Sequence, residues 1–111
     1  MDVLFADEKA ALLYSRQTAL RQRYGAIGAT KITLRLQQLE AAPTLAHMRS
    51  LPGRCHALVA DRGGQFALDV HHPHRLVFEP AHPVSATDPI SGADPWSLID
   101  AVTIIGVVDY H

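Results

Sequence analysis

The sequence has a single cysteine, Cys55, so it cannot close a disulfide within the chain. A disulfide-stapled secreted scaffold is therefore excluded, and a reducing compartment is expected. The longest apolar run, 102–108, is interrupted by Thr103 and Gly106 and is too short to span a bilayer. The first residues carry neither a basic region nor a long apolar stretch, so no signal peptide is predicted. We expect a cytoplasmic protein with no membrane partner.

Several patterns that mark common catalytic sites are also missing from the sequence. There is no glycine-rich phosphate-binding loop, no pair of cysteines at zinc-finger spacing and no Gly-x-Ser-x-Gly nucleophile elbow. No internal repeat or low-complexity tract is visible either. These absences argue against a P-loop enzyme, a zinc module, a serine hydrolase of the common type and a repeat protein.

Charge is scarce and unevenly divided along the chain. Charged residues make up 19%, hydrophobic residues 48%, and the net charge is −1. This balance is typical of a globular domain, and 111 residues are too few for two independent cores, so we expect one domain over 1–111. Residues 1–54 hold eight Lys/Arg against four Asp/Glu, and residues 55–111 hold two against seven. A basic helical face can meet phosphate, but charge alone favours an ordinary solvated face.

Two helices are predicted in the first part of the chain. Asp7 can cap a helix over Glu8–Tyr24, and Gly25 is a natural stop. A second helix is predicted over Ala26–Ala42, with Arg35 on a side away from its apolar stripe. That stripe consists of Ala29, Ile32, Leu36 and Leu39. The tight connection between the two helices indicates a helical hairpin.

The rest of the chain has the pattern of strands. The predicted strands are Val3–Phe5, Cys55–Val59, Gln65–Val70, Arg75–Glu79 and Val102–Tyr110. Alternating apolar residues indicate half-buried strands in the middle of the chain, and the last segment has the β-branched, apolar composition of a central strand. The layout predicts an α+β fold in which helices cover one side of a mostly antiparallel sheet.

Two connecting segments show weaker helical signals. Thr44–Ser50 is predicted to form one helical turn, and so is Asp94-Pro95-Trp96, which resembles an N-cap followed by proline at the first helical position. The second turn lies in the long connection between Glu79 and Val102, and connections of that length tend to be functional or mobile. We interpret Trp96 as an anchor that fastens this connection to the body, with a partner contact as the alternative.

Four short segments carry the polar residues that can do chemistry. They are Leu51-Pro52-Gly53-Arg54-Cys55-His56-Ala57-Leu58, Ala60-Asp61-Arg62-Gly63-Gly64-Gln65, Arg75-Leu76-Val77-Phe78-Glu79-Pro80 and Val108-Asp109-Tyr110-His111. In this order and at this spacing they resemble the HigB branch of the RelE/ParE toxin superfamily, over most of the chain. The resemblance implies a RelE-like fold, in which an N-terminal strand and a helical hairpin pack on a mostly antiparallel sheet.

The resemblance also implies a function. Members of the branch are toxins of type II toxin–antitoxin systems that cut mRNA in the ribosomal A site without a metal ion or cofactor, and so block translation. The implied partners are the ribosome, its mRNA and a helix-turn-helix antitoxin of the HigA type. Matched by motif, the implied catalytic residues are His56, Arg75, Tyr110 and His111, with Asp109 in a supporting role.

The residue types agree with that reaction. Attack of the RNA 2′-hydroxyl on phosphorus needs a base, an acid for the leaving oxygen and a cation near the developing charge. Histidine suits the first two roles and Arg75 the third, since a guanidinium binds phosphate oxygens in a bidentate manner. The sequence does not decide which of His56 and His111 is base and which is acid. Arg54 and Arg62 are interpreted as residues that position the RNA phosphates.

Two features keep other hypotheses open. The near-neutral charge and the presence of only two lysines, Lys9 and Lys31, are unusual for the superfamily. They motivate a second hypothesis, a non-catalytic relative that only binds its antitoxin, or a ParE-like inhibitor of gyrase. His71, His72 and His74 raise the question of a zinc or nickel site. No metal site is predicted, because a proline interrupts the cluster and neighbouring strand residues point to opposite faces.

Overall fold

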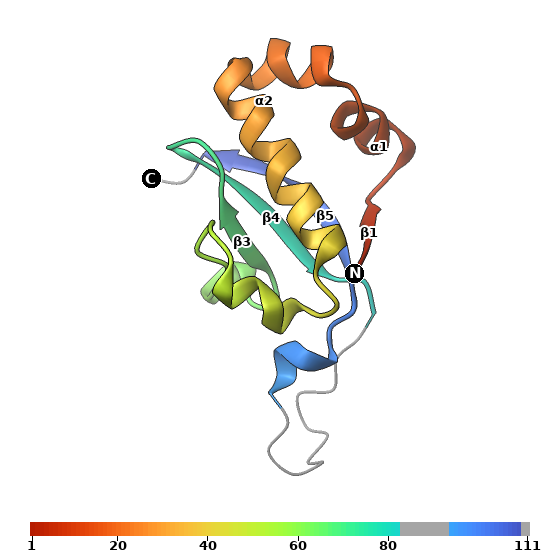
Figure 1. Cartoon of the computed structure of the whole chain (residues 1–111), viewed down its shortest axis with the longest axis vertical. Helices are drawn as coiled ribbons and strands as arrows, with labels where there is room; N and C mark the ends of the chain where they lie inside the picture. Colours follow the sequence, from red (N-terminus) through yellow and green to blue (C-terminus); the bar gives the residue numbers. More distant parts are fainter. Residues whose placement is uncertain (83–93, 110–111) are drawn as a thin grey trace.

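One five-stranded sheet organises the residues described by the computed structural model, which are 1–82 and 94–109 (Figure 1). The strands are β1 (Asp2–Phe5), β2 (His56–Ala57), β3 (Phe66–Asp69), β4 (His74–Pro80) and β5 (Ala101–Asp109). They lie in the order β1-β5-β4-β3-β2; β1 pairs with β5 in parallel, and the other pairings are antiparallel. The predicted α+β fold, a strand and helical hairpin on a mostly antiparallel sheet, is confirmed.

The two faces of the sheet differ in what covers them. Helix α2 (Gln17–Ala41) runs diagonally across one face of β3, β4 and β5 (Figure 1). The strand residues that join the main core on this side are Phe66, Leu68, Leu76, Phe78, Val102 and Ile104. Cross-strand partners share a face, so the residues between them point to the other side. There Ala67, Val77 and Leu58 form a smaller apolar cluster, joined by Val108.

The first predicted helix is interrupted, and this correction moves the start of the second. Helix α1 covers Glu8–Ser15, capped as predicted by Asp7, whose Oδ1 accepts from the N–H of Ala10 at 2.7 Å. The predicted continuation to residue 24 is wrong, because Arg16 has φ −114° and ψ 110°. Tyr14 and Leu20 are both buried, although on one continuous helix they would point about 120° apart. The break allows both to reach the core.

Helix α2 contains the predicted stop at Gly25, which has φ 78° and ψ 170°. The run therefore consists of two helical halves that meet at this residue, the second being the predicted helix over 26–42 with its end at Ala41. The predicted stripe of Ala29, Ile32, Leu36 and Leu39 is buried, as expected. No helix in the described ranges is long and apolar enough to cross a bilayer.

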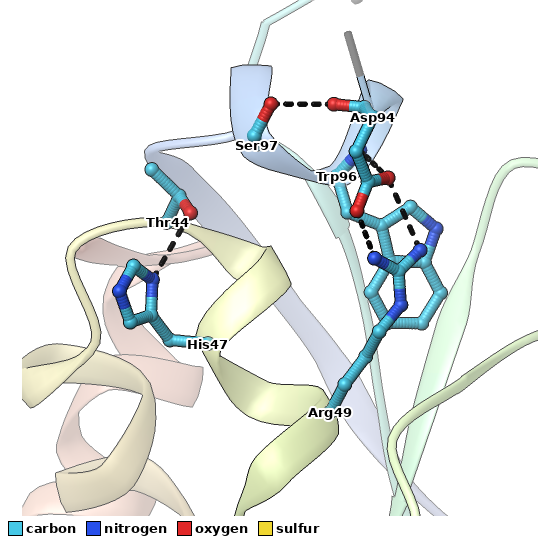
Figure 2. Close-up of polar contacts among 6 residues, drawn as sticks. All are labelled: Thr44, His47, Arg49, Asp94, Trp96 and Ser97. Carbon is cyan, nitrogen blue, oxygen red and sulfur yellow. Dashed lines mark hydrogen bonds and ion pairs between the residues drawn. The ribbon is translucent and has the colours of Figure 1, made fainter.

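Two 3-10 turns, η1 (Leu45–Ser50) and η3 (Pro95–Leu98), confirm both weaker helical predictions. Asp94 caps η3 by accepting from the N–H of Trp96 at 3.1 Å, and its carboxylate forms an ion pair with Arg49 of η1 (Figure 2). The Arg49 guanidinium also lies 4.0 Å from the centroid of the Trp96 ring. That ring meets Phe66 of β3 edge-on at 5.1 Å, so Trp96 is an anchor, as interpreted from the sequence.

The strands keep the predicted positions with shifted ends. The largest difference is β2, which covers only His56–Ala57 of the predicted 55–59. Arg54 before it and Ala60 after it both have positive φ, which ends extended pairing on either side. The predicted turn at Gly63-Gly64 is present, and Gly64 has φ 87°. Strand β5 ends at Asp109 in the described range, and Tyr110, predicted as its last residue, lies outside the described residues.

Candidate functional site

A tight turn between η1 and β2 begins the candidate site. Gly53 has φ 118° and Arg54 has φ 51°, a left-handed conformation that non-glycine residues rarely adopt. The Gly53 carbonyl accepts from the N–H of Asp69 at 2.7 Å, which ties the turn to β3. A Cβ added to Gly53 would lie 2.9 Å from Nε of Arg35, so the turn packs directly on that side chain. The turn is therefore fixed to both the sheet and α2.

Arg35 reaches from α2 to the end of β3 and is buried, with 6% of its surface exposed. Its Nε donates to the Asp69 carbonyl at 2.8 Å and its Nη1 donates to Gln38 Oε1 at 3.1 Å. Burial lowers the pKa of Arg35, and the charge of Asp69 opposes this shift. Helical periodicity places Arg35 outside the apolar stripe of α2 and so predicts an exposed side chain. The side chain is nevertheless buried because a backbone carbonyl and an amide accept its N–H groups.

The Asp69 carboxylate connects the two arginines that the sequence singles out on this side of the molecule. Arg54 Nε lies 2.5 Å from Oδ2, and Arg75 Nε lies 3.2 Å from Oδ1. Asp69 and Arg75 are cross-strand partners in β3 and β4, so their side chains leave the sheet on the same face. The hydrogen bond to Asp69, strengthened by its charge, raises the pKa of Arg54. One carboxylate thus holds two guanidinium groups together.

A hollow of about 400 Å³ lies beside this bridge and is lined by Arg54, Cys55, His56 and Arg75. Three of these four residues are site residues predicted from the sequence. They come from two segments about 20 positions apart, and the β2–β3–β4 pairing brings them to one face. By strand alternation this is the sheet face opposite α2, because His56 pairs with Ala67 and Arg75 with Asp69. An imidazole and two cations therefore face one hollow.

The His56 ring is held in one tautomer by the backbone of the turn. Its Nδ1 lies 2.7 Å from the carbonyl oxygen of Arg54. A carbonyl can only accept, so Nδ1 carries the proton of this hydrogen bond. In the neutral ring, Nε2 then has an available lone pair. The geometry makes Nε2 of His56 the atom that can take a proton from a bound group.

Cys55 lines the same hollow, but its thiol is not a nucleophile. Burial raises the pKa of Cys55 to about 12, and the nearby Arg49 charge opposes this only in part. A reactive cysteine needs its thiolate, which is scarce at neutral pH when the pKa lies that high. Cys55 also packs against the main core. Its place in the hollow is therefore structural.

Other predicted site residues lie elsewhere. Arg62, in the 3-10 turn η2 (Ala60–Arg62), donates to Gln65 Oε1 at 3.2 Å and does not line the hollow. Asp109 of β5 pairs with His74 of β4. By strand alternation its side chain lies on the helix-covered face of the sheet, whereas that of Arg75 lies on the other face. The predictions for Tyr110 and His111 fall outside the described residues.

Sequence reasoning missed the two residues that organise the arginines, Asp69 and Arg35. A signal for Asp69 was present: Asp69 and Arg75 each lie three positions from His72, in the middle of the β3–β4 connection. Opposite charges at such positions of a hairpin are expected to face each other across the strands. No comparable signal marked Arg35, whose partner is a backbone carbonyl 34 positions away.

A larger hollow, about 520 Å³, lies away from these residues, among α1, the first half of α2 and β5. Its charged lining residues are Asp7, Lys9, Arg16 and Arg23, and its aromatic ones are Tyr14 and Tyr24. None of the described residues that line it is a histidine, the side chain whose ordinary pKa is near neutral. We place the candidate reaction site at His56 and treat this larger hollow as a binding surface.

Metal ligands do not converge in the described ranges, where no three or more His, Cys, Asp or Glu side chains form a group able to hold an ion. The ring of His74 instead meets Tyr24 of α2 edge-on, with 5.8 Å between the ring centroids. The candidate site therefore offers guanidinium and imidazole groups for binding an anion.

Comparison with known proteins identifies the fold. No protein-family model matches the chain, and no curated protein matches its sequence. Among solved structures, a YoeB/ParE toxin from Agrobacterium tumefaciens matches with a TM-score of 0.58 at 16% identity, over 100% of both chains. A YoeB–YefM complex from Staphylococcus aureus matches with a TM-score of 0.55 at 17% identity, over 100% of this chain and 97% of that one. The chain thus has the same fold as these YoeB and ParE toxins.

Proposed function

We propose that the chain is the toxin of a type II toxin–antitoxin pair and a metal-independent endonuclease of mRNA on the ribosome, of the HigB type. The observation that carries this proposal is the hollow in which His56 faces Arg54 and Arg75. Phosphate is the anion that such an arginine pair suits best, and the imidazole supplies the proton acceptor. The toxin fold supports the same reading.

The proposed reaction uses these groups in defined roles. Nε2 of His56 takes the proton from an RNA 2′-hydroxyl, and the 2′-oxygen attacks the adjacent phosphorus. Arg54 and Arg75 stabilise the negative charge that develops on the phosphorane oxygens. The 5′-oxygen leaves with a proton, and we assign its donor to His111 by motif. The products are a 2′,3′-cyclic phosphate and a 5′-hydroxyl end.

The proposed partners follow from the same assignment. The solved structures of similar fold include toxin–antitoxin complexes of YoeB with YefM. For this chain we propose a helix-turn-helix antitoxin of the HigA type, together with the ribosome and its mRNA in the cytoplasm. Tyr110 is proposed to contact the RNA by stacking or hydrogen bonding, a common mode of binding unpaired bases.

Controlled expression in a bacterial host tests the proposal. We expect the wild type to arrest growth and to produce new 5′-hydroxyl ends within translated frames. The cuts should disappear in His56→Ala and in His111→Ala, and persist in the matched control His71→Ala, whose side chain is exposed and does not line the hollow at His56. Purified toxin that fails to cut mRNA on translating ribosomes, or that cuts only with added metal, would contradict the proposal.

A second candidate function is a non-catalytic binding protein, either a relative that only pairs with an antitoxin or a ParE-like inhibitor of gyrase. The 520 Å³ hollow between the helices and β5 favours it, because three cations and two tyrosines line a surface that suits an acidic partner. Growth arrest without RNA cuts would favour a ParE-like inhibitor of gyrase. Soluble protein that causes neither arrest nor cuts would favour a relative that only binds its antitoxin.

A further inference from the structure

A second hollow lies at the turn between β3 and β4, where the sequence has its cluster of histidines. It measures about 230 Å³, and its lining residues are Arg54, Asp69, Val70, His72, Pro73, His74 and Arg75. Its size suits a group smaller than a typical drug-like ligand. The proposed reaction leaves this hollow without a role.

The two hollows share a wall. Arg54 and Arg75 line both of them, with Cys55 and His56 completing one and His72 and His74 completing the other. An anionic chain that places one charged group beside His56 therefore passes this wall before it reaches the second hollow. The backbone of single-stranded RNA has this form, since each nucleotide brings one further phosphate.

The chemistry of the second hollow favours an anion. Among the described lining residues, two guanidinium groups stand against one carboxylate, which contacts both through their Nε atoms. A guanidinium has five N–H donors, and the side chain of Arg54 is 73% exposed, so its contact through Nε leaves it able to bind a further anion. An imidazole always has at least one ring nitrogen able to donate, whichever tautomer is present.

The turn that carries the two histidines is held in place. The N–H of His74 donates to the carbonyl of His71 at 2.8 Å, which closes the turn. The His74 ring packs edge-on against Tyr24, so α2 supports it from behind. His72 is exposed and lines the hollow, whereas His71 is equally exposed and does not. The chain therefore provides a test residue and a matched control side by side.

We propose that this second hollow binds the backbone phosphate next to the one that is cut, with His72 as a donor to its oxygens. The proposal rests on the proposed function, because it assumes that RNA occupies the hollow at His56. It adds a phosphate subsite that extends the contact with RNA by one nucleotide.

The test uses uncleavable RNA and the full chain freed of any antitoxin. Three 2′-O-methyl dinucleotides of one sequence are compared: one without a terminal phosphate, one with a 5′-phosphate and one with a 3′-phosphate. We expect one of the terminal phosphates to tighten binding by about fivefold to tenfold, the range of a charge-assisted contact. The gain should fall below about twofold in His72→Gln and persist in His71→Gln.

A second measurement uses the wild-type protein and does not depend on how the variants fold. The imidazole signal of His72 is expected to shift in NMR spectra on titration with the tighter dinucleotide, and that of His71 to stay. Equal affinity for all three dinucleotides, or a gain unchanged in His72→Gln, would overturn the subsite. If inorganic phosphate binds as tightly as the phosphorylated dinucleotide, the hollow binds free phosphate and the assignment to an RNA backbone is wrong. If the terminal phosphate still tightens binding but the protein does not cut mRNA on ribosomes, the proposed function is wrong and the phosphate subsite stands.

Discussion

At the scale of single residues, Asp69 decides how the candidate site is arranged. Arg54 and Arg75 carry like charges that repel each other at short range, and the carboxylate between them offsets that repulsion. Arg54 is otherwise unconstrained, because 73% of its side chain is exposed. Arg35 in turn holds the Asp69 backbone from the opposite side. Asp69 is therefore a positioning residue for the two cations.

Replacing Asp69 by Asn is expected to lower cleavage of ribosome-bound mRNA at least about tenfold, since both arginines lose their anionic partner and the single amide oxygen cannot replace both carboxylate oxygens. The amide keeps the size of the side chain, but its Nδ2 cannot accept from a guanidinium. We expect the turnover number to fall more than the affinity for RNA, because Arg54 and Arg75 remain cationic but lose their alignment. Single-turnover and binding measurements on purified toxin separate the two effects.

The control for this prediction is Glu40→Gln, which makes the same change of charge at an exposed position of α2. It should cleave at the wild-type rate. Asp69→Glu should recover part of the lost rate, because it restores the carboxylate with one extra methylene. Cleavage by Asp69→Asn at the wild-type rate, with its thermal unfolding unchanged, would show that the bridge does not position the arginines.

At the scale of elements, sequence patterns located the strands and helices but not all their ends. The periodicities were sufficient because burial of apolar faces decides them. The break at Arg16 escaped prediction since no glycine or proline marks it, and it serves the burial of Tyr14 and Leu20. The short β2 escaped because Arg54 and Ala60 have positive φ, a conformation that non-glycine residues rarely adopt and that no sequence pattern marked here.

The same limit applies to the candidate site. Motif spacing predicted that His56 and Arg75 act together, and both line one hollow. The face on which Asp109 lies could be assigned only once its cross-strand partner was known. The β4–β5 register pairs it with His74 and puts it on the helix-covered face, away from His56 and Arg75. The buried Arg35 depends on a carbonyl far away in the chain, which no local pattern contains. Long-range polar partners were therefore the part that the sequence did not reveal.

The turn at Gly53 gives a prediction at this scale. Gly53→Ala is expected to destabilise the fold by about 2–3 kcal/mol, because alanine is strained at φ 118° and its Cβ would meet Arg35 at 2.9 Å. Gly64→Ala is the matched control: it also has a positive φ, 87°, but open space around its Cβ position. It should cost only about 1 kcal/mol.

Urea unfolding at neutral pH measures both variants. The difference between their unfolding free energies reports the packing of Gly53 on Arg35, since the backbone strain is common to both. Equal losses for the two glycines would mean that the Arg35 side chain moves aside at no cost. Arg35 would then not be rigidly held, and its role in fixing Asp69 would be wrong.

At the scale of the whole molecule, Tyr14 joins the elements that surround the 520 Å³ hollow. Its ring stacks on Phe5 of β1, with 5.5 Å between the ring centroids. The Val107 backbone in β5 and the Tyr24 side chain in α2 both lie near enough to its hydroxyl to affect its pKa. Helix α1 is short, so these contacts, together with its cap, hold it in place. The integrity of this side of the molecule therefore depends on a neutral, buried phenol.

The ionisation of this phenol gives the last prediction. Burial raises the pKa of Tyr14 to about 12 from its ordinary value of 10.0, and the neighbouring Tyr24 adds to the shift. In the unfolded chain the phenol loses its proton at the lower pH, so its contribution to stability is complete below pH 10 and is lost as the pH rises towards 12. The loss is expected to reach about 2 kcal/mol. Tyr14→Phe should lack this part of the alkaline decline.

Urea unfolding between pH 8 and 11.5 measures the contribution of Tyr14 ionisation to the loss of stability. The experiment uses a Cys55→Ala background, because burial raises the pKa of that thiol as well. At pH 8 the phenylalanine variant should be less stable by about 1 kcal/mol, because it lacks the hydroxyl and its polar contacts. The two stability curves should converge as the pH rises, because only the tyrosine protein still has a buried proton to lose. Parallel curves would show that Tyr14 is not buried enough to resist ionisation, and α1 would then be held to the sheet mainly by its apolar contacts.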